Sequence, residues 1–165
     1  MELININEFK KKSIRRYVIH IVLVSLLLVG TIAGCILSLL FSKLDYTVNL
    51  IINLSVSIVV AILTIFYFVN IFPIIHHYYS FAKNLNEVGL EHRRRREFVQ
   101  ELDVKTVNNV NYRVMLFSYK EGENTYKENL YVLDNDVVFE KGKAYKITSH
   151  RNVIIRFEDL SDANN

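Results

Sequence analysis

The chain has 165 residues, enough for one modest domain or for a membrane anchor with a small domain attached. It is 51% hydrophobic and yet 22% charged, so the two kinds of residue must be segregated along the chain. Its single cysteine, Cys35, excludes a disulfide framework. Segment 74–165 holds 14 Lys/Arg and 14 Asp/Glu residues, and this balance argues against non-specific nucleic-acid binding despite a pI near 8.9.

Two long apolar segments follow a basic N-terminus formed by residues 1–16. Residues 18–41 and 48–72 contain no charged side chain. Each segment exceeds the roughly 20 residues needed to cross a hydrocarbon core about 30 Å thick, and a helix satisfies its own backbone there. The first is too long for the h-region of a signal peptide, and no small-residue cleavage site follows it. The sequence therefore predicts a transmembrane hairpin over residues 17–72.

Charge asymmetry predicts the orientation of this hairpin. Five basic residues precede the first segment, at positions 10, 11, 12, 15 and 16, whereas the connector 42–47 carries only Lys43 and Asp45. By the positive-inside rule the N-terminus and everything after the second segment are cytoplasmic. We therefore expect an integral protein of a bacterial inner membrane or a plasma membrane.

Small and polar residues recur at every fourth position in both apolar segments. They are Gly30, Gly34 and Ser38 in the first, and Asn49, Asn53, Ser57 and Ala61 in the second. Residues four apart share one helical face, and small residues let membrane helices approach closely. Either the two faces pack against each other within one chain, or part of them lines a contact between subunits or a pore.

Pro73 predicts the end of the second helix. Beyond it, apolar residues recur at spacings of four and three, which is the pattern of a packed helix: Ile74, Tyr78, Phe81, Leu85 and Val88. Gly89 weakens this helix, and four consecutive arginines follow it, Arg93, Arg94, Arg95 and Arg96. We therefore assign residues 73–100 to a juxtamembrane helix and the arginine run.

Three interpretations of the arginine run stay open. The guanidiniums can be solvated or paired with acidic residues nearby, at positions 87, 91, 97 and 101. They can bind anionic lipid. They can also bind an anionic ligand or partner, because arginine suits bidentate recognition of phosphate. In a ring of subunits, one such run per chain would gather many guanidiniums around an axis.

From about residue 101 the pattern changes to period two. It predicts five or six short antiparallel strands, near Val104 and at 112–119, 125–133, 137–140, 144–149 and 153–157. A small barrel-like sheet would hide the edges of such strands. We assign this α+β chain a small cytosolic β domain over residues 101–160, with a tail at 161–165. Arg113, His150 and Arg151 of this domain join the arginine run as candidate ligand-binding residues.

No catalytic motif is present in the sequence. It contains no P-loop, no glycine-rich dinucleotide loop and no zinc-protease motif. Asp134, Asn135 and Asp136 lack the glycine and distal glutamate of a calcium loop, so we interpret them as a turn. Adjacent His76 and His77 point in different directions on a helix and are better suited to a membrane interface than to a metal. We therefore expect no enzymatic activity, no metal and no cofactor.

The layout of the chain resembles the two-helix membrane effectors of bacterial anti-phage defence. The resemblance lies in the apolar segments 18–41 and 48–72 followed by the β segment 102–158. It implies a cytosolic domain that senses a cyclic nucleotide or oligonucleotide and drives membrane disruption. Because it concerns layout and no sequence motif, it assigns no binding residues.

Two functional hypotheses follow from the sequence. The first is an oligomeric integral membrane protein, an effector or channel-like protein, whose β domain senses an anionic ligand and relays this to the helices. The second is a non-enzymatic membrane anchor or adaptor whose β domain docks a protein partner. The expected partners are membrane lipids, further copies of the chain, and an anionic small ligand or a cytosolic protein.

Overall fold

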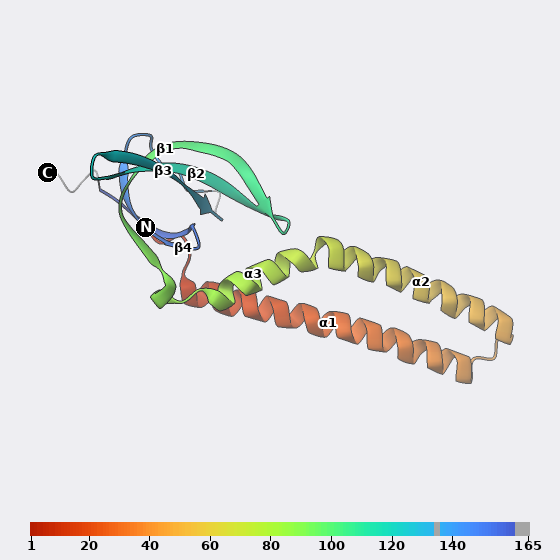
Figure 1. Cartoon of the computed structure of the whole chain (residues 1–165). Helices are drawn as coiled ribbons and strands as arrows, with labels where there is room; N and C mark the ends of the chain where they lie inside the picture. Colours follow the sequence, from red (N-terminus) through yellow and green to blue (C-terminus); the bar gives the residue numbers. More distant parts are fainter. Residues whose placement is uncertain (134–135, 161–165) are drawn as a thin grey trace. The chain divides into compact units, whose positions relative to one another are not determined.

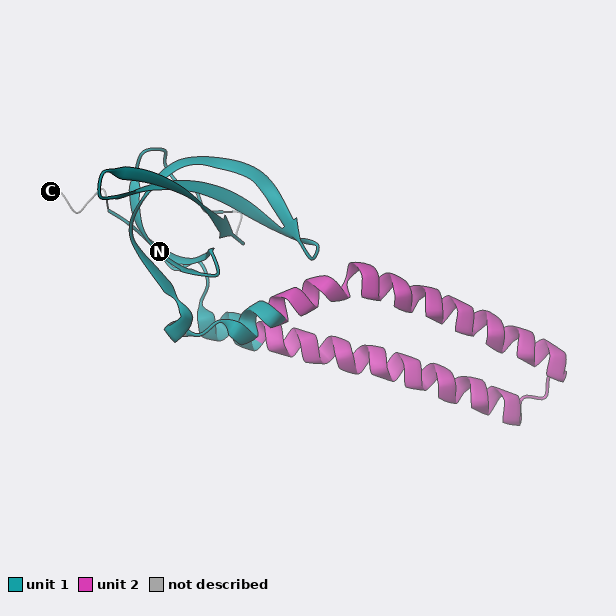
Figure 2. Ribbon diagram, in the orientation of Figure 1, with its two compact units in different colours: residues 1–11, 80–165 teal, residues 12–79 magenta. Residues whose placement is uncertain are grey.

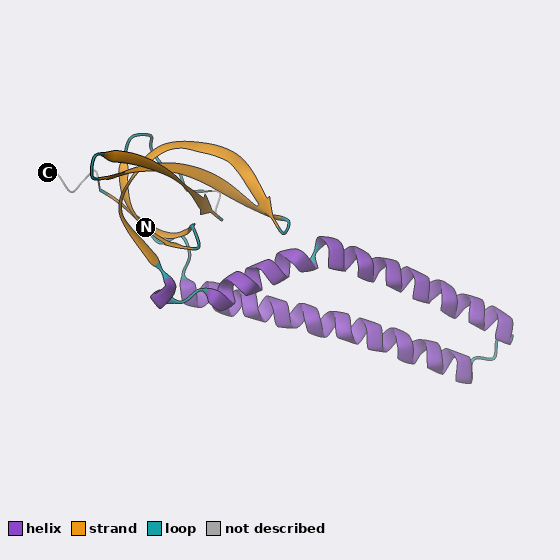
Figure 3. Ribbon diagram, in the orientation of Figure 1, coloured by secondary structure: helices purple, strands orange, loops and turns teal. Residues whose placement is uncertain are grey.

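The structure, a computed structural model, describes residues 1–133 and 136–160. The predicted tail at 161–165 and two residues of the predicted turn, 134–135, lie outside the described residues. Three α-helices come first and five strands follow (Figures 1 and 3). The chain divides into two compact units, residues 12–79 and residues 1–11 with 80–165 (Figure 2).

Helices α1 (Ile6–Phe41) and α2 (Tyr46–Asn70) form the predicted hairpin. Both are long and apolar enough to cross a membrane, and their apolar side chains face outward; Leu40, for example, is 69% exposed. Asp45 caps α2 by accepting a hydrogen bond from the backbone N–H of Thr47 at 2.9 Å. The third helix, α3 (Phe72–Asn84), follows immediately. Pro73 lies in its first turn, where a missing N–H costs nothing, so the predicted break is confirmed.

The predicted juxtamembrane helix is present as α3, but it is shorter than the apolar spacing indicated. Helix α3 ends at Asn84, and a short 3-10 turn, η1 (Glu87–Gly89), separates it from strand β1 (Glu91–Val107). The arginine run therefore lies in a strand. The helical spacing was misleading at its last position, because Val88 is fully exposed. The strand predicted near Val104 is the second half of β1, but its first half was missed because a run of charged residues lacks the alternation and the β-formers that mark strands.

The five strands form a closed barrel, which confirms the predicted small β domain. The remaining strands are β2 (Val110–Glu121), β3 (Asn124–Val132), β4 (Ala144–His150) and β5 (Val153–Asp159). Their order is β1-β2-β3-β5-β4, antiparallel except for a single parallel pairing of β3 with β5. Two-residue turns with positive φ, at 108–109 and 151–152, close the hairpins β1–β2 and β4–β5. Three of these four positions are asparagines, a residue type that tolerates the left-handed conformation.

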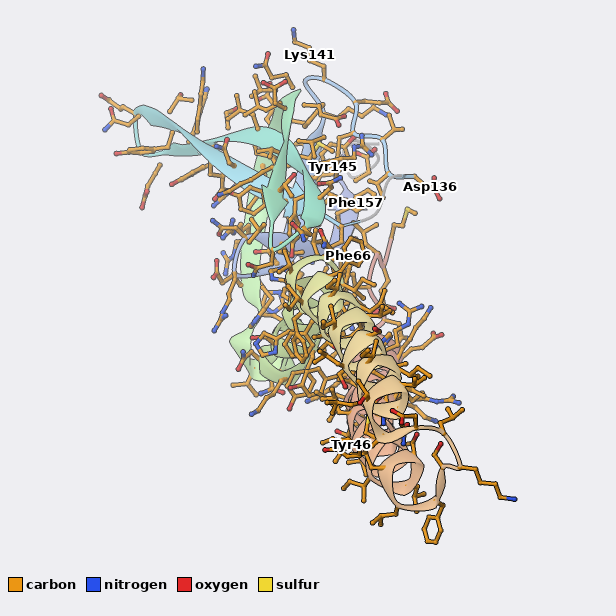
Figure 4. All side chains as sticks on the ribbon, turned by 90° about the vertical axis from the view of Figure 1, so that its right-hand side faces the viewer. Tyr46, Phe66, Asp136, Lys141, Tyr145 and Phe157 are labelled. Carbon is orange, nitrogen blue, oxygen red and sulfur yellow. The ribbon has the colours of Figure 1, made fainter. Side chains whose placement is uncertain are left out.

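Aromatic and aliphatic side chains fill the barrel. Phe117 is fully buried, and its ring lies 5.5 Å from that of Phe98 and 5.4 Å from that of Phe139. The prediction of a strand at 137–140 is wrong, because this segment is a loop that inserts Phe139 into the core. Its alternation of buried and exposed residues resembles a strand for that reason. Figure 4 shows Lys141 at the tip of the same loop, whereas Tyr145 and Phe157 lie within the body of the barrel.

The first residues of the chain extend the sheet, which the sequence did not predict. The backbone N–H of Leu3 donates to the carbonyl of Ile155 at 2.9 Å, and that of Phe157 donates to the carbonyl of Met1 at 2.9 Å. Helix α1 begins at Ile6, directly after this pairing. Within the same unit, Phe9 of α1 makes an edge-to-face contact with Phe81 of α3 at 5.8 Å.

Candidate site on the bulged strand

The arginine run contains a β-bulge. Arg93 pairs with Ile147 of β4 and Arg96 pairs with Tyr145, so three steps along β1 match two steps along β4. One extra residue is therefore accommodated between the two arginines. Ile147 and Tyr145 both point into the core, and cross-strand partners share a face. The bulge thus turns two of the four arginines toward the inside of the barrel, even though alternation alone would put them on opposite faces.

Arg93 and Arg96 converge on one carboxylate. Nη1 of Arg93 lies 2.9 Å from Oε2 of Glu128, and Nε of Arg96 donates to Oε1 of the same side chain. Glu128 belongs to β3, where it pairs with Phe117 of β2, so its side chain also points to the inner face. The three side chains are only 11%, 17% and 22% exposed, in the order Arg93, Arg96, Glu128. They form a partly buried ionic cluster at the rim of the barrel.

Further groups orient the two guanidiniums. Nη2 of Arg93 donates to Oδ1 of Asn152 at 2.9 Å and also contacts the exposed carboxylate of Glu91. The guanidinium of Arg96 lies 3.9 Å from the ring centre of Tyr119, within the range of a cation–π contact, and Nη1 donates to the carbonyl of Arg95 at 3.0 Å. Glu128 is therefore one of several groups that orient each arginine.

Arg94 and Arg95 occupy the bulge itself and are exposed. Among the side chains that the structure describes, neither guanidinium has an ion-pair partner. Arg151 is also exposed, in the turn next to Asn152, which contacts Arg93. The exposed guanidiniums of Arg94, Arg95 and Arg151 thus lie on two segments, β1 and the β4–β5 turn. The Arg93–Asn152 contact joins these two segments. This arrangement provides free donors for an anion.

The other two predicted ligand-binding residues have structural roles. Arg113 makes a bidentate pair with Glu101, at 2.7 and 2.6 Å, and donates to the carbonyl of Val137 at 2.8 Å. The hydrogen bond from Arg113 lowers the pKa of the Glu101 carboxyl. His150 is buried; its Nδ1 lies 3.2 Å from the carbonyl oxygen of Gly89 and its ring packs edge-on against Phe81. The structure does not bring either side chain into the cluster.

A polar hollow of about 660 Å³ lies over β4 and β5 beside the arginine strand. Nδ1 of His92 lies 3.2 Å from Oγ1 of Thr148 on its wall. The cations that line it are already paired, Lys146 with Glu158 at 3.3 Å and Arg156 with Glu2 at 3.2 Å. The bulge is therefore the better anion site. Among the described residues, no group of three His, Cys, Asp or Glu side chains is placed to hold a metal ion.

The small-residue stripes of the hairpin meet only in part. Oγ of Ser38 donates to Oδ1 of Asn49 at 2.7 Å, Nδ2 of Asn49 donates to the Ser38 carbonyl at 2.8 Å, and Asn53 donates to Oδ1 of Asn49 at 3.1 Å. The bonds between Ser38 and Asn49 join the two helices within one chain, whereas the bond of Asn53 lies within α2. A methyl group added at Gly30 or Gly34 would meet no atom within 4 Å.

Of the remaining residues of the second stripe, one faces the other helix and one is exposed. The hydroxyl of Ser57 lies 3.7 Å from Sγ of Cys35 on α1, so this position also faces the partner helix. Ala61, one turn further along, is exposed. Gly30 and Gly34, with Cys35 and Asn53, line an open hollow of about 400 Å³ on the hairpin. Part of each stripe is thus left uncovered within a single chain.

The sequence did not identify Glu128, Tyr119 or Asn152 as parts of the arginine cluster. Tyr119 and Tyr126 face each other across β2 and β3 with ring centres 5.6 Å apart, in the strands that the alternating pattern predicted. A signal was present in Glu128, a carboxylate two residues before Leu130 on the inner face of β3. An inward carboxylate needs a cation, and the arginine run is the richest source. Comparison of the chain with known protein families, with curated proteins and with solved structures found no match.

Proposed function

We propose that this chain is a non-enzymatic integral membrane protein whose barrel binds an anionic ligand at the bulge of β1. In this proposal α1 and α2 cross the membrane and the barrel lies in the cytoplasm. The outward-facing apolar side chains of the hairpin support insertion, because lipid is the solvent that favours them. The asymmetry of basic residues between the N-terminus and the connector supports the orientation.

The single observation that carries ligand binding is the exposure of Arg94 and Arg95 on the bulge. Both are free of ion pairs within the described part of the chain, whereas their neighbours Arg93 and Arg96 are paired inside the rim. Bulges are common next to binding sites, where they redirect side chains. Two adjacent free guanidiniums favour an oxyanion, and a phosphate group offers them several acceptor oxygens. Cyclic nucleotides are one ligand class of this kind.

A signal at the barrel can reach the hairpin through the hydrogen bonds between β5 and the first residues of the chain. Residues 1–4 pair with β5, and α1 begins at Ile6, so a shift of β5 acts on the first turn of a membrane helix. We further propose that the relay operates in an oligomer, with the open faces of Gly30 and Gly34 in contact with another copy. Gly34→Leu adds a side chain whose Cβ would meet no atom within 4 Å in its own chain. It should therefore weaken cross-linking between copies while leaving the fold intact, and an unchanged cross-linking ladder contradicts this interface.

The second candidate function is a membrane adaptor whose barrel docks a protein. Exposed apolar side chains on the barrel favour it, namely Val104, Tyr126 and Val138. Scattered apolar residues are ordinary on protein surfaces, so this support is weaker than that of the free arginines.

The test uses the full chain in detergent, because residues 1–4 belong to the barrel's sheet. Cyclic dinucleotides and short oligonucleotides are titrated by calorimetry into the parent and into R94Q/R95Q. The control, K120Q/K127Q, removes the same charge from β2 and β3. Loss of each charge-assisted contact should cost about 1.5–3 kcal/mol of binding energy. Binding by the parent that only R94Q/R95Q loses supports the proposal. If the parent binds none of these probes, the ligand-binding proposal is wrong and the adaptor function replaces it. If R94Q/R95Q loses only its binding to anionic liposomes, the bound anion is a lipid.

A further inference from the structure

We propose that Glu128 is a resident anion that occupies a second phosphate site, formed by Arg93 and Arg96. A phosphate group of the ligand displaces the side chain of Glu128. Arg93 and Arg96 then bind the ligand together with the exposed Arg94 and Arg95. This inference rests on the proposed function, and it adds how the same site is regulated.

The geometry around Glu128 is that of a filled oxyanion site. Two guanidiniums approach one carboxylate from the same strand, one through Nη1 of Arg93 at 2.9 Å and the other through Nε of Arg96. Each oxygen of Glu128 serves a different arginine. A phosphodiester group also presents two charged oxygens and can serve both donors at once, and a terminal or inorganic phosphate adds a further oxygen and a larger charge. The chemistry that recognises Glu128 is therefore the chemistry that recognises phosphate.

The site does not depend on Glu128 for its shape. Arg93 is also held by Asn152, and Arg96 is also held by the ring of Tyr119 and by the carbonyl of Arg95. These contacts remain when the carboxylate leaves. The two guanidiniums thus stay oriented for an incoming anion, which lowers the entropic cost of binding.

Glu128 can leave the site without a change of fold. Its backbone is held by the pairing of β3 with β2, whereas its side chain is 22% exposed at the rim. A rotation of the side chain therefore exchanges protein contacts for water. Until it rotates, it competes with the ligand as a tethered group, at an effective concentration in the millimolar range or above.

The test measures binding of inorganic phosphate to the full chain in detergent, by calorimetry at low salt. E128Q should bind roughly tenfold tighter than the parent, since the tethered competitor is gone. E101Q is the matched control, because it breaks a separate arginine–carboxylate pair, Arg113–Glu101, and removes the same charge. The gain in E128Q should disappear in E128Q/R96Q, and E101Q should match the parent.

Two results would overturn the inference. One is equal phosphate affinity for E128Q and the parent, with E128Q only less stable to heat; Glu128 would then be a structural ion-pair partner. The other is an equal gain in E101Q, which would show a general effect of charge. The proposed function fails separately, because it requires loss of binding in R94Q/R95Q, whatever E128Q does.

Discussion

The hairpin and the barrel place their polar and apolar side chains in opposite ways. In the hairpin the hydroxyls of Thr31, Ser55 and Thr64 each bond the carbonyl four residues earlier in their own helix, at 2.7–2.8 Å. The apolar side chains face outward. In the barrel the apolar side chains are inside and the charged ones lie at the rim and surface, where several of them form ion pairs. The barrel therefore carries its own core, whereas the hairpin leaves its apolar side chains uncovered, as the proposed insertion into a membrane requires.

Removal of a core ring from the barrel should have the largest effect on stability. Phe117→Ala deletes a fully buried ring with edge-to-face contacts to Phe98 and Phe139, and we expect a loss of about 3–5 kcal/mol. Leu40→Ala, at an exposed position of α1, should change stability by no more than about 0.5 kcal/mol. Urea unfolding of the full chain in detergent, followed by near-ultraviolet circular dichroism, measures both. Equal losses would mean that the hairpin has a core of its own.

Loss of the hydrogen bonds between the two helices should have an intermediate effect. Asn49→Leu removes the bonds that join Asn49 to Ser38 and Asn53, and we expect a loss of about 1 kcal/mol. Ser55→Ala is the control, because its hydroxyl bonds only the carbonyl of Ile51 in the same helix. Thermal unfolding in detergent compares the two variants. If Asn49→Leu is no less stable than Ser55→Ala, the Asn49 bonds do not stabilise the hairpin.

The smallest effect should come from the pair that the exposed Glu101 forms with Arg113. The pKa of Glu101 is lowered in the folded state, so its contribution is present above the pKa of the unfolded chain and is lost as pH falls through the lowered value. For an exposed carboxylate the contribution is below about 1 kcal/mol. Glu101→Gln should therefore be slightly less stable than the parent at pH 7, and the difference should vanish in acid. Urea titrations at several pH values measure it, and a difference that grows in acid would contradict the assignment.

The sequence predicted those elements in which the pattern of apolar and polar residues follows the environment of the side chains. The apolar segments gave the hairpin, and alternation gave strands β2 to β5 within a few residues. Only the second half of β1, near Val104, was predicted, because the charged first half lacks β-formers. The facing of Arg93 and Arg96 could not be predicted either, because a bulge places both on one face against the ordinary alternation. The loop that carries Phe139 was mistaken for a strand because burial of alternate residues occurs in both.

The sequence could predict that the candidate site binds an anion, but it could not predict which residues form the site. Four arginines in a row indicated an anion, and self-pairing was one of the interpretations left open. Which residues are paired depends on contacts between distant strands: Glu128 lies 32 residues from Arg96 in sequence. The division into two free arginines, Arg94 and Arg95, and two paired ones follows only from the barrel.

Topology in the membrane tests the central claim most directly. In a Cys35→Ser background, single cysteines are placed at Leu44, in the connector, and at Tyr126, on the barrel; both positions are exposed. Intact cells expressing each variant are treated with a membrane-impermeant maleimide, before and after lysis. We predict labelling of Leu44→Cys in intact cells and labelling of Tyr126→Cys only after lysis. Labelling of Tyr126→Cys from outside, or protection of Leu44→Cys until lysis, would contradict the account.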